Sequence, residues 1–271
     1  MFLEIFDVEH GQCAHLMSDF GTQVLIDCGH NTSTGWRPST YLSQLGIRKL
    51  DKLIITNYDE DHASDLANLR AQVAIESMFG NPSVNADALI NLKNIGGIGN
   101  GIKALSEMKR AYVGAVPPSQ DTALNFQYFW NNYPSDFDDE NNLSMVTVID
   151  FSGVRFCFPG DIETAGWESL LRAPAFVSAI STVNILVASH HGRENGCSEL
   201  LYAQTGLHPQ LTIVSDSGIQ HSTQETVQWY ANRTSGITID GTLRRVLTTR
   251  SDGRIRFANN GNGWTVARHA H

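Results

Sequence analysis

The sequence predicts an α+β fold in which two β-sheets pack face to face and helices cover their outer faces. Three observations support this prediction. The chain has 271 residues, enough to build a large hydrophobic core. Its hydrophobic content of 41% and charged content of 17% are typical of a globular protein. Each half contains several strand-like runs followed by helix-like segments, and the two halves are similar in plan.

The N-terminal half opens with strands and continues into helices. Alternating and β-branched residues predict strands at 2–8, 13–18, 23–27 and 51–56. Helices are expected at 39–46 and 63–69.

The middle of the chain has the weakest pattern. We expect residues 1–271 to form one domain with a family-specific insertion around 75–135. A helix is predicted at 102–110. The glycine-rich GGIGNG at 96–101 does not follow a strong strand, so we interpret it as a loop rather than a phosphate-binding turn.

The C-terminal half has a sharper pattern. Residues 143–151 and 154–161 predict a hairpin that turns at Ser152 and Gly153. Further strands are expected at 184–189, 211–215, 237–240 and 246–250, with a final hairpin starting at 255–257. Helices are expected at 163–172, 198–204 and 223–233.

The net charge argues against one class of binding partner. A net charge of -9 argues against extended duplex binding, because such surfaces carry a basic excess. A small phosphate ester remains compatible, since a bound metal ion supplies positive charge locally.

The cellular location is expected to be cytoplasmic. The N-terminus lacks the basic and long apolar regions of a signal peptide, and no apolar run is long enough to span a membrane. The four cysteines form no CxxC pair, which favours free thiols in a reducing compartment.

A cluster of carboxylates follows the strand predicted at 51–56. Asp59 and Asp61 alternate, so in an extended segment they face the same side, and His62 follows directly. So much negative charge at a strand exit is unfavourable unless a cation or solvent compensates it. The alternative is that Asp61 or Ser64 caps the next helix.

Two other strand exits carry candidate ligands. Asp161 follows an apolar strand that stops at a proline and a glycine, and His190 and His191 follow another. Taken alone, the first is compatible with an ordinary Gly-Asp turn, and the second with one buried and one exposed histidine. Together, mixed aspartate and histidine ligands favour Zn²⁺, Mn²⁺ or Fe over Ca²⁺ or Mg²⁺.

The ordered set of motifs resembles the metallo-β-lactamase superfamily, whose signature is HxHxDH followed by a histidine, a Gly-Asp and a last histidine. Within it, the chain is most similar to the soluble domain of the ComEC-type competence proteins and their stand-alone relatives. The resemblance covers most of the chain and is weakest at 75–135. It is carried by DVEHGQCAHL with LIDCG, ITNYDEDHASDL, NNLSMVTVIDFSGVRFCFPGDIE and VASHHGRENGCSELL.

The resemblance implies an αββα four-layer sandwich and a set of metal ligands. These are Asp59, Asp61, His62, Asp161 and a histidine of the pair His190–His191, with Asp161 in the place of the aspartate that bridges two metals. Asn57 stands where the family has its first histidine, and no histidine occurs between 63 and 160. We therefore expect one firm Zn or Mn site and a second that is weak, Mn-like or empty.

Further residues receive roles from the resemblance. Asp61 would both bind the metal and orient a catalytic water. His221 resembles a histidine that donates a proton or holds a phosphate oxygen, although a surface-loop histidine fits equally well. Asp7, His10 and Asp27 are expected to line the site or support its ligands.

The resemblance favours a metal-dependent hydrolase of a phosphodiester, as a nucleotide or single-stranded nucleic acid. Aromatic residues at 126–133 could stack on bases, or could belong to the core or an interface. One alternative is a carbonyl-ester, lactone or thioester hydrolase of the same fold. Another, motivated by Asn57, is a non-catalytic member that binds a ligand or partner. No membrane association is expected.

Overall fold

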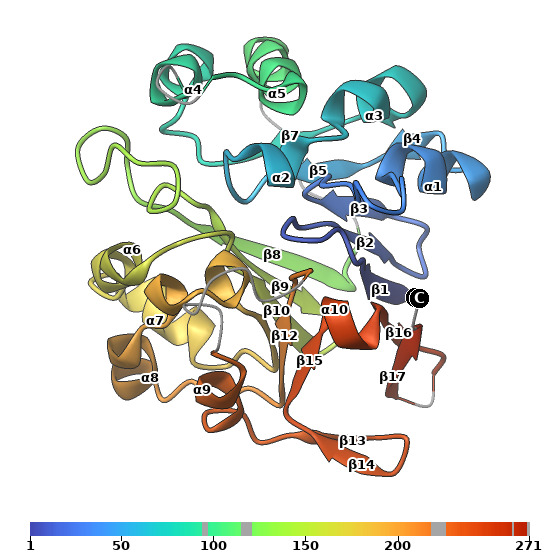
Figure 1. The fold of residues 1–271 in the computed structure, drawn as a ribbon, viewed down its shortest axis with the longest axis vertical. Coiled ribbons are helices and arrows are strands. Elements are labelled where there is room, and N and C mark those ends of the chain that lie inside the picture. The colour runs from blue at the N-terminus through green and yellow to red at the C-terminus, as the bar shows by residue number, and fades with distance from the viewer. Residues whose placement is uncertain (94–96, 115–120, 218–225, 262, 270–271) are drawn as a thin grey trace.

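The structure is a computed structural model that describes residues 1–93, 97–114, 121–217, 226–261 and 263–269. Two large β-sheets lie between two groups of helices (Figure 1). This arrangement confirms the α+β sandwich predicted from the sequence.

The first sheet has the strand order β17-β16-β1-β2-β3-β5-β7. Strand β3 pairs in parallel with β5, and β5 with β7, whereas the other pairs are antiparallel. The C-terminal hairpin therefore completes the sheet that the N-terminus starts. The strands are β1 (Phe2–Ile5), β2 (Ala14–Met17), β3 (Gln23–Ile26), β5 (Lys52–Ile54), β7 (Met78–Phe79), β16 (Arg254–Asn259) and β17 (Trp264–His269).

The second sheet has the order β15-β12-β11-β10-β9-β8. The predicted hairpin is confirmed as β9 and β10, and its turn residues Ser152 and Gly153 have φ values of 49° and 83°, as a tight hairpin turn requires. The strands are β8 (Leu124–Phe129), β9 (Val146–Phe151), β10 (Val154–Phe158), β11 (Ile185–Val187), β12 (Leu211–Val214) and β15 (Val246–Thr248).

Helices cover the outer face of each sheet. The first group is α1 (Pro38–Gln44), α2 (Glu60–Ala63), α3 (Leu66–Gln72), α4 (Ala86–Leu92) and α5 (Asn100–Ala111). The second is α6 (Thr164–Leu170), α7 (Pro174–Ile180), α8 (Glu199–Thr205) and α9 (Val227–Ala231), followed by α10 (Thr249–Asp252). Short strand pairs β4 (Lys49–Leu50) with β6 (Ala74–Ile75) and β13 (Ile237–Ile239) with β14 (Thr242–Arg244) lie outside the main sheets.

Three hydrophobic layers hold the sandwich together. Strand side chains alternate between faces, so Leu3 and Ile5 enter the central layer between the sheets together with Phe156 and Phe257. The outer layers lie under the two helix groups: one contains Leu53, Leu66 and Leu105, and the other contains Trp167, Phe176 and Ile180. The order helix–sheet–sheet–helix is that of an αββα sandwich.

The segment 75–135, expected to be an insertion, takes part in both main sheets. It contains α4 and α5, and its strands β7 and β8 lie at the edges of the first and second sheets. Phe126 and Tyr128 of β8 are partly buried against the central core, and Tyr128 stacks on Phe79 with 5.2 Å between ring centroids. These contacts favour the core interpretation of the aromatic stretch over base stacking.

Two further features of the described residues can be stated. No helix in the described ranges is both long and apolar enough to cross a bilayer. All four cysteines are unpaired thiols, and Cys13, Cys28 and Cys157 are buried.

Candidate metal centre

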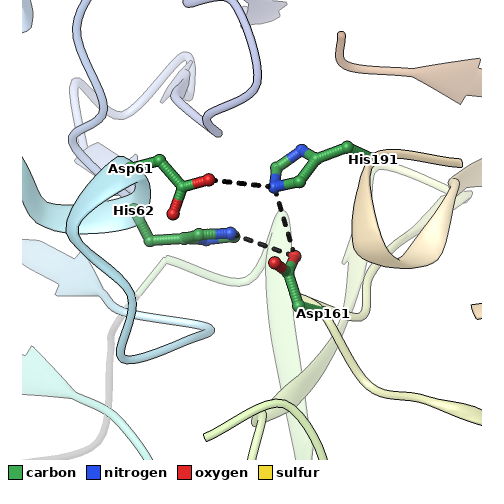
Figure 2. Close-up of side chains that lie close together, drawn as sticks. All are labelled: Asp61, His62, Asp161 and His191. Atoms are coloured by element: carbon green, nitrogen blue, oxygen red, sulfur yellow. Dashed lines mark hydrogen bonds and ion pairs between the residues drawn. The ribbon is translucent and has the colours of Figure 1, made fainter. Parts of the chain in front are cut away.

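Four of the predicted ligands meet at one edge of the sandwich. Asp61, His62, Asp161 and His191 each bring one ligand atom to within 4.8 Å of the others. Figure 2 shows their side chains pointing toward one another. Asp61 and His62 lie on α2 after β5, Asp161 follows β10, and His191 lies in the 3-10 turn Ser189–Gly192 after β11. Both sheets therefore contribute to the cluster.

The contacts within this cluster are short. His62 Nε2 lies 3.1 Å from Asp161 Oδ1, and His191 Nε2 lies 3.4 Å from both Asp161 Oδ1 and Asp61 Oδ2. Three of the side chains are buried, whereas 40% of the Asp61 side chain is exposed. Access to the cluster is therefore from the side of Asp61.

The cluster fits a single divalent cation. Asp61 Oδ1 is buried without a hydrogen-bond partner, which is costly unless something else satisfies it, and His191 Nε2 has only its two ion-pair contacts of 3.4 Å, longer than a usual hydrogen bond. A pocket of about 10 Å³ beside His62, Asp161 and His191 has room for one water-sized particle. Two imidazole nitrogens and two carboxylate groups form a donor set that suits Zn²⁺ or Mn²⁺.

A strained backbone turn aims His191 at the cluster. His190 and His191 have φ values of 50° and 53°, in the left-handed region that residues other than glycine rarely adopt. The turn is held by the His190 backbone N–H, which donates to the Gly160 carbonyl at 3.2 Å. It directs the two adjacent imidazoles to different places.

Both imidazoles are oriented through their second ring nitrogen. His62 Nδ1 lies 2.9 Å from Asp27 Oδ2, and His191 Nδ1 lies 3.1 Å from the Ser215 carbonyl oxygen. Thr56 fixes Asp27 in turn, because its backbone N–H and its hydroxyl donate to the two carboxylate oxygens at 2.7 and 2.5 Å. Such partners fix the tautomer and orientation of metal-binding histidines.

The electrostatics of the four groups are balanced. Burial lowers the pKa of His62, but the Asp161 and Asp27 carboxylates outweigh it and raise that pKa well above its usual value. Burial also lowers the pKa of His191, and Asp161 and Asp61 raise it to about 10. For Asp161, burial raises the pKa, but the His191 and His62 imidazoles hold it well below the usual range. Two imidazolium groups thus match the two carboxylates of the cluster, with Asp27 as a third carboxylate behind His62, and a divalent cation could replace the two protons without changing the total charge.

The three consecutive carboxylates at the start of α2 have separate partners. Asp59 forms a short ion pair with the Lys93 ammonium and does not belong to the cluster, contrary to the sequence prediction. Glu60 accepts hydrogen bonds from the backbone N–H groups of Gly101 and Ile102 at 2.7 and 3.1 Å, at the start of α5. Only Asp61 faces the cluster, because a helix turns successive side chains in different directions.

His190 also lies outside the cluster. Its Nδ1 is 3.6 Å from Glu163 Oε1, and its Nε2 is 3.2 Å from Arg193 Nη1. The sequence left open which of the two histidines is a ligand. The backbone turn places His191 in the cluster and turns His190 toward α6.

The helix-cap alternative does not describe Asp61 or Ser64. Asp59 is the N-cap residue of α2, without a side-chain cap hydrogen bond. The Ser64 hydroxyl instead accepts from the His30 backbone N–H at 3.1 Å and lies 2.6 Å from His30 Nδ1.

The nitrogen and the oxygen of the Asn57 side-chain amide both form hydrogen bonds. Its Nδ2 donates to Ser144 Oγ at 3.0 Å, and its Oδ1 accepts from the Asp59 backbone N–H at 2.7 Å. It supports the loops around the cluster and does not face it as a ligand.

The other predicted residues differ in their distance from the cluster. Asp27 contacts His62 directly. Burial lowers the pKa of His10, and the charges of His191 and Asp61 also act on that pKa, so His10 lies beside the cluster. Asp7 lines a separate cavity of about 280 Å³ with Phe6, Asn31, Thr34, Trp36, Arg254 and His269. His221 lies outside the described residues.

Several supporting residues escaped the sequence analysis. Ser144 Oγ accepts the Asp161 backbone N–H at 3.0 Å, and the Ser215 hydroxyl donates to the Gly11 carbonyl at 2.7 Å. A Cβ atom on Gly11 or Gly29 would lie 2.5 or 2.3 Å from the Asp61 carbonyl oxygen. Only backbone fits there, and a single glycine in a sequence gives no sign of such a contact.

The two adjacent histidines provide a matched test of the site. We expect His191→Asn to lower the affinity for Zn²⁺ or Mn²⁺ by about 100-fold or more, since changes even to groups behind the ligands cost about 10–100-fold. His190→Asn should bind metal like the original chain. Asparagine tolerates the left-handed backbone at both positions, so folding is little perturbed. Elemental analysis after dialysis measures the difference, and equal metal loss in both variants would contradict the assignment.

Metal binding should release protons. Because the pKa values of His62 and His191 are raised, both imidazoles are protonated at neutral pH without metal, and the cation must displace about two protons. Affinity should therefore fall as the pH is lowered, by up to about tenfold per pH unit for each displaced proton. Titration calorimetry in buffers of different ionisation enthalpy measures the release, and binding without it would rule out this charge exchange.

The close approach at Gly29 should be sensitive to one methyl group. Gly29→Ala places Cβ against the Asp61 carbonyl, so we expect a loss of about 1–3 kcal/mol in the free energy of unfolding and weaker metal binding. Gly114→Ala is the control, because no atom of the residues that the structure describes lies within 4 Å of its added Cβ. Urea unfolding measures both, and unchanged stability in the first variant would show that the contact is not tight.

Comparison with known proteins identifies the fold. No family model matches the chain. ComE operon protein 3 of Bacillus subtilis is 25% identical over 258 residues, which cover 87% of this chain and 30% of that protein. This chain therefore matches only a minor part of that relative.

One solved structure shows the same arrangement. Igni18, described as a novel metallo hydrolase from Ignicoccus hospitalis, superposes with a TM-score of 0.51 at 15% identity and covers 96% of this chain and 100% of that chain. A structure from Thermotoga maritima gives a lower TM-score of 0.42 at 10% identity and covers 91% of this chain and 98% of that chain. The chain shares its fold with the metallo hydrolase Igni18 and is similar over most of its length to part of ComE operon protein 3.

Proposed function

We propose that this chain is a metal-dependent hydrolase whose ligands are Asp61, His62, Asp161 and His191. The observation that carries the proposal is that these groups converge from both sheets, leave Asp61 Oδ1 buried without a hydrogen-bond partner, and hold His191 Nε2 only by two ion-pair contacts of 3.4 Å. An ordinary buried ion-pair network would satisfy those atoms within the protein.

The arrangement suits hydrolysis by an activated water. A Zn²⁺ or Mn²⁺ ion bound at this cluster would lower the pKa of a water and polarise a substrate oxygen. Asp61 is the one exposed ligand, so its carboxylate is placed to orient a water on the open side. Asp27 and Ser215 hold the two imidazoles in position from behind. Burial of the other three ligands keeps bulk water off the inner side.

The proposed substrate is a phosphodiester in a nucleotide or a single-stranded nucleic acid. The motif resemblance to ComEC-type proteins and the 25% identity to ComE operon protein 3 support this class. The net charge of -9 favours a small or single-stranded substrate over extended duplex. His221 is proposed as a proton donor to the leaving group. We place the protein in the cytoplasm, which agrees with its four unpaired cysteines.

A substrate panel tests the proposal. With Zn²⁺ or Mn²⁺ the chain should cleave bis-p-nitrophenyl phosphate, and Asp161→Asn should reduce kcat/KM by about 100-fold or more, because it removes a ligand charge. Asp87→Asn is the matched control, since that carboxylate lies at the surface beside Arg110.

The outcomes separate the alternatives. Cleavage of lactones or thioesters with phosphodiesters left intact would overturn the substrate class. If every substrate stays intact in a chain that holds its metal, the protein is a binding member rather than an enzyme.

A further inference from the structure

An ammonium group sits inside an acidic cluster next to the proposed metal centre. Lys93 follows α4, and its Nζ forms a short ion pair with Asp59 Oδ1 and a second one with Glu140 Oε1 at 2.9 Å. Only 10% of the Lys93 side chain is exposed. We call Asn57, Asp59, Lys93 and Glu140 the Lys93 cluster.

The Lys93 cluster is joined to the metal centre by chain and by hydrogen bonds. Asp59 and Asn57 lie just before Asp61 in sequence. The Ser144 hydroxyl accepts from Asn57 Nδ2 and from the Asp161 backbone N–H, both at 3.0 Å. A change of charge in one cluster therefore lies next to the ligands of the other.

Without Lys93, the cluster would be a reasonable site for a second cation. It would present two carboxylates, Asp59 and Glu140, and carboxylate oxygens suit Mn²⁺ or Mg²⁺. Two unpaired carboxylates at a partly buried position are also unfavourable unless a positive charge compensates them.

The ammonium already supplies that charge. Burial lowers the pKa of Lys93, but the hydrogen bonds that its ammonium donates to the Asp59 and Glu140 carboxylates outweigh this effect and raise it, so the group is a cation at neutral pH. A metal ion entering the cluster would meet a fixed positive charge at contact distance, and would have to displace it from both carboxylates.

We propose that Lys93 takes the place of a second metal ion beside the centre, so that this chain holds a single catalytic ion with an internal ammonium as its neighbour. The inference rests on the proposed function, because it requires an ion at Asp61, His62, Asp161 and His191. In this proposal the Lys93 ammonium excludes a second metal ion and neutralises the Asp59 and Glu140 carboxylates.

Metal stoichiometry tests the proposal directly. Titrated with Mn²⁺ under calorimetry, and assayed by elemental analysis after dialysis, the original chain should bind about one ion per chain. Lys93→Arg keeps a cation and should give the same value. Lys93→Met removes the charge at similar length and should allow an additional, weaker Mn²⁺ ion to bind. Electron paramagnetic resonance of the original chain should show an isolated Mn²⁺ ion rather than an exchange-coupled pair.

Two results would overturn the role of Lys93, and a third would overturn the proposed function. Two ions bound to the original chain would overturn the role of Lys93, even if Lys93→Met fails to fold. So would a folded Lys93→Met chain, checked by circular dichroism, that takes up no further ion at saturating Mn²⁺. If the original chain binds no metal at all, the proposed function itself fails, which is a distinct result.

Discussion

The buried imidazole of His62 is the interaction on which the site depends. Its two ring nitrogens contact Asp27, at the end of β3 in the first sheet, and Asp161, after β10 in the second sheet. A planar ring with two fixed nitrogens allows little movement, so this one residue sets how the edges of the two sheets meet. The other ligands of the metal centre lie around this imidazole.

Three of the six non-glycine residues with positive φ in the described ranges lie at the same edge. Asp27, His190 and His191 all have left-handed backbone angles, and each such residue costs about 1–3 kcal/mol. The surrounding sheets and hydrogen bonds hold these residues in place. The left-handed backbone of His191 directs its side chain to the cluster, and that of Asp27 occurs at the residue that supports His62, which is the pattern expected where a site is assembled in advance of its ligand.

The sequence predicted the fold and the central residues because both leave strong local signals. Apolar strands that stop at Asp61–His62, Asp161 and His191 mark strand exits, and strand exits of packed sheets meet at an edge. The sequence could not separate Asp59 from Asp61 or His190 from His191, since a helix turn and a left-handed turn decide which neighbour faces inward. Lys93 was missed because its partners, Asp59 and Glu140, are far from it in sequence. The edge strands β7 and β8 have a weak hydrophobic pattern in the sequence, because each pairs with only one other strand.

The most direct measurement is anomalous diffraction from crystals of the chain grown with Zn²⁺, collected on both sides of the zinc absorption edge. The account predicts one strong peak within bonding distance, about 2.0–2.2 Å, of ligand atoms from Asp61, His62, Asp161 and His191. A peak elsewhere, or none at this cluster at saturating Zn²⁺, would contradict it.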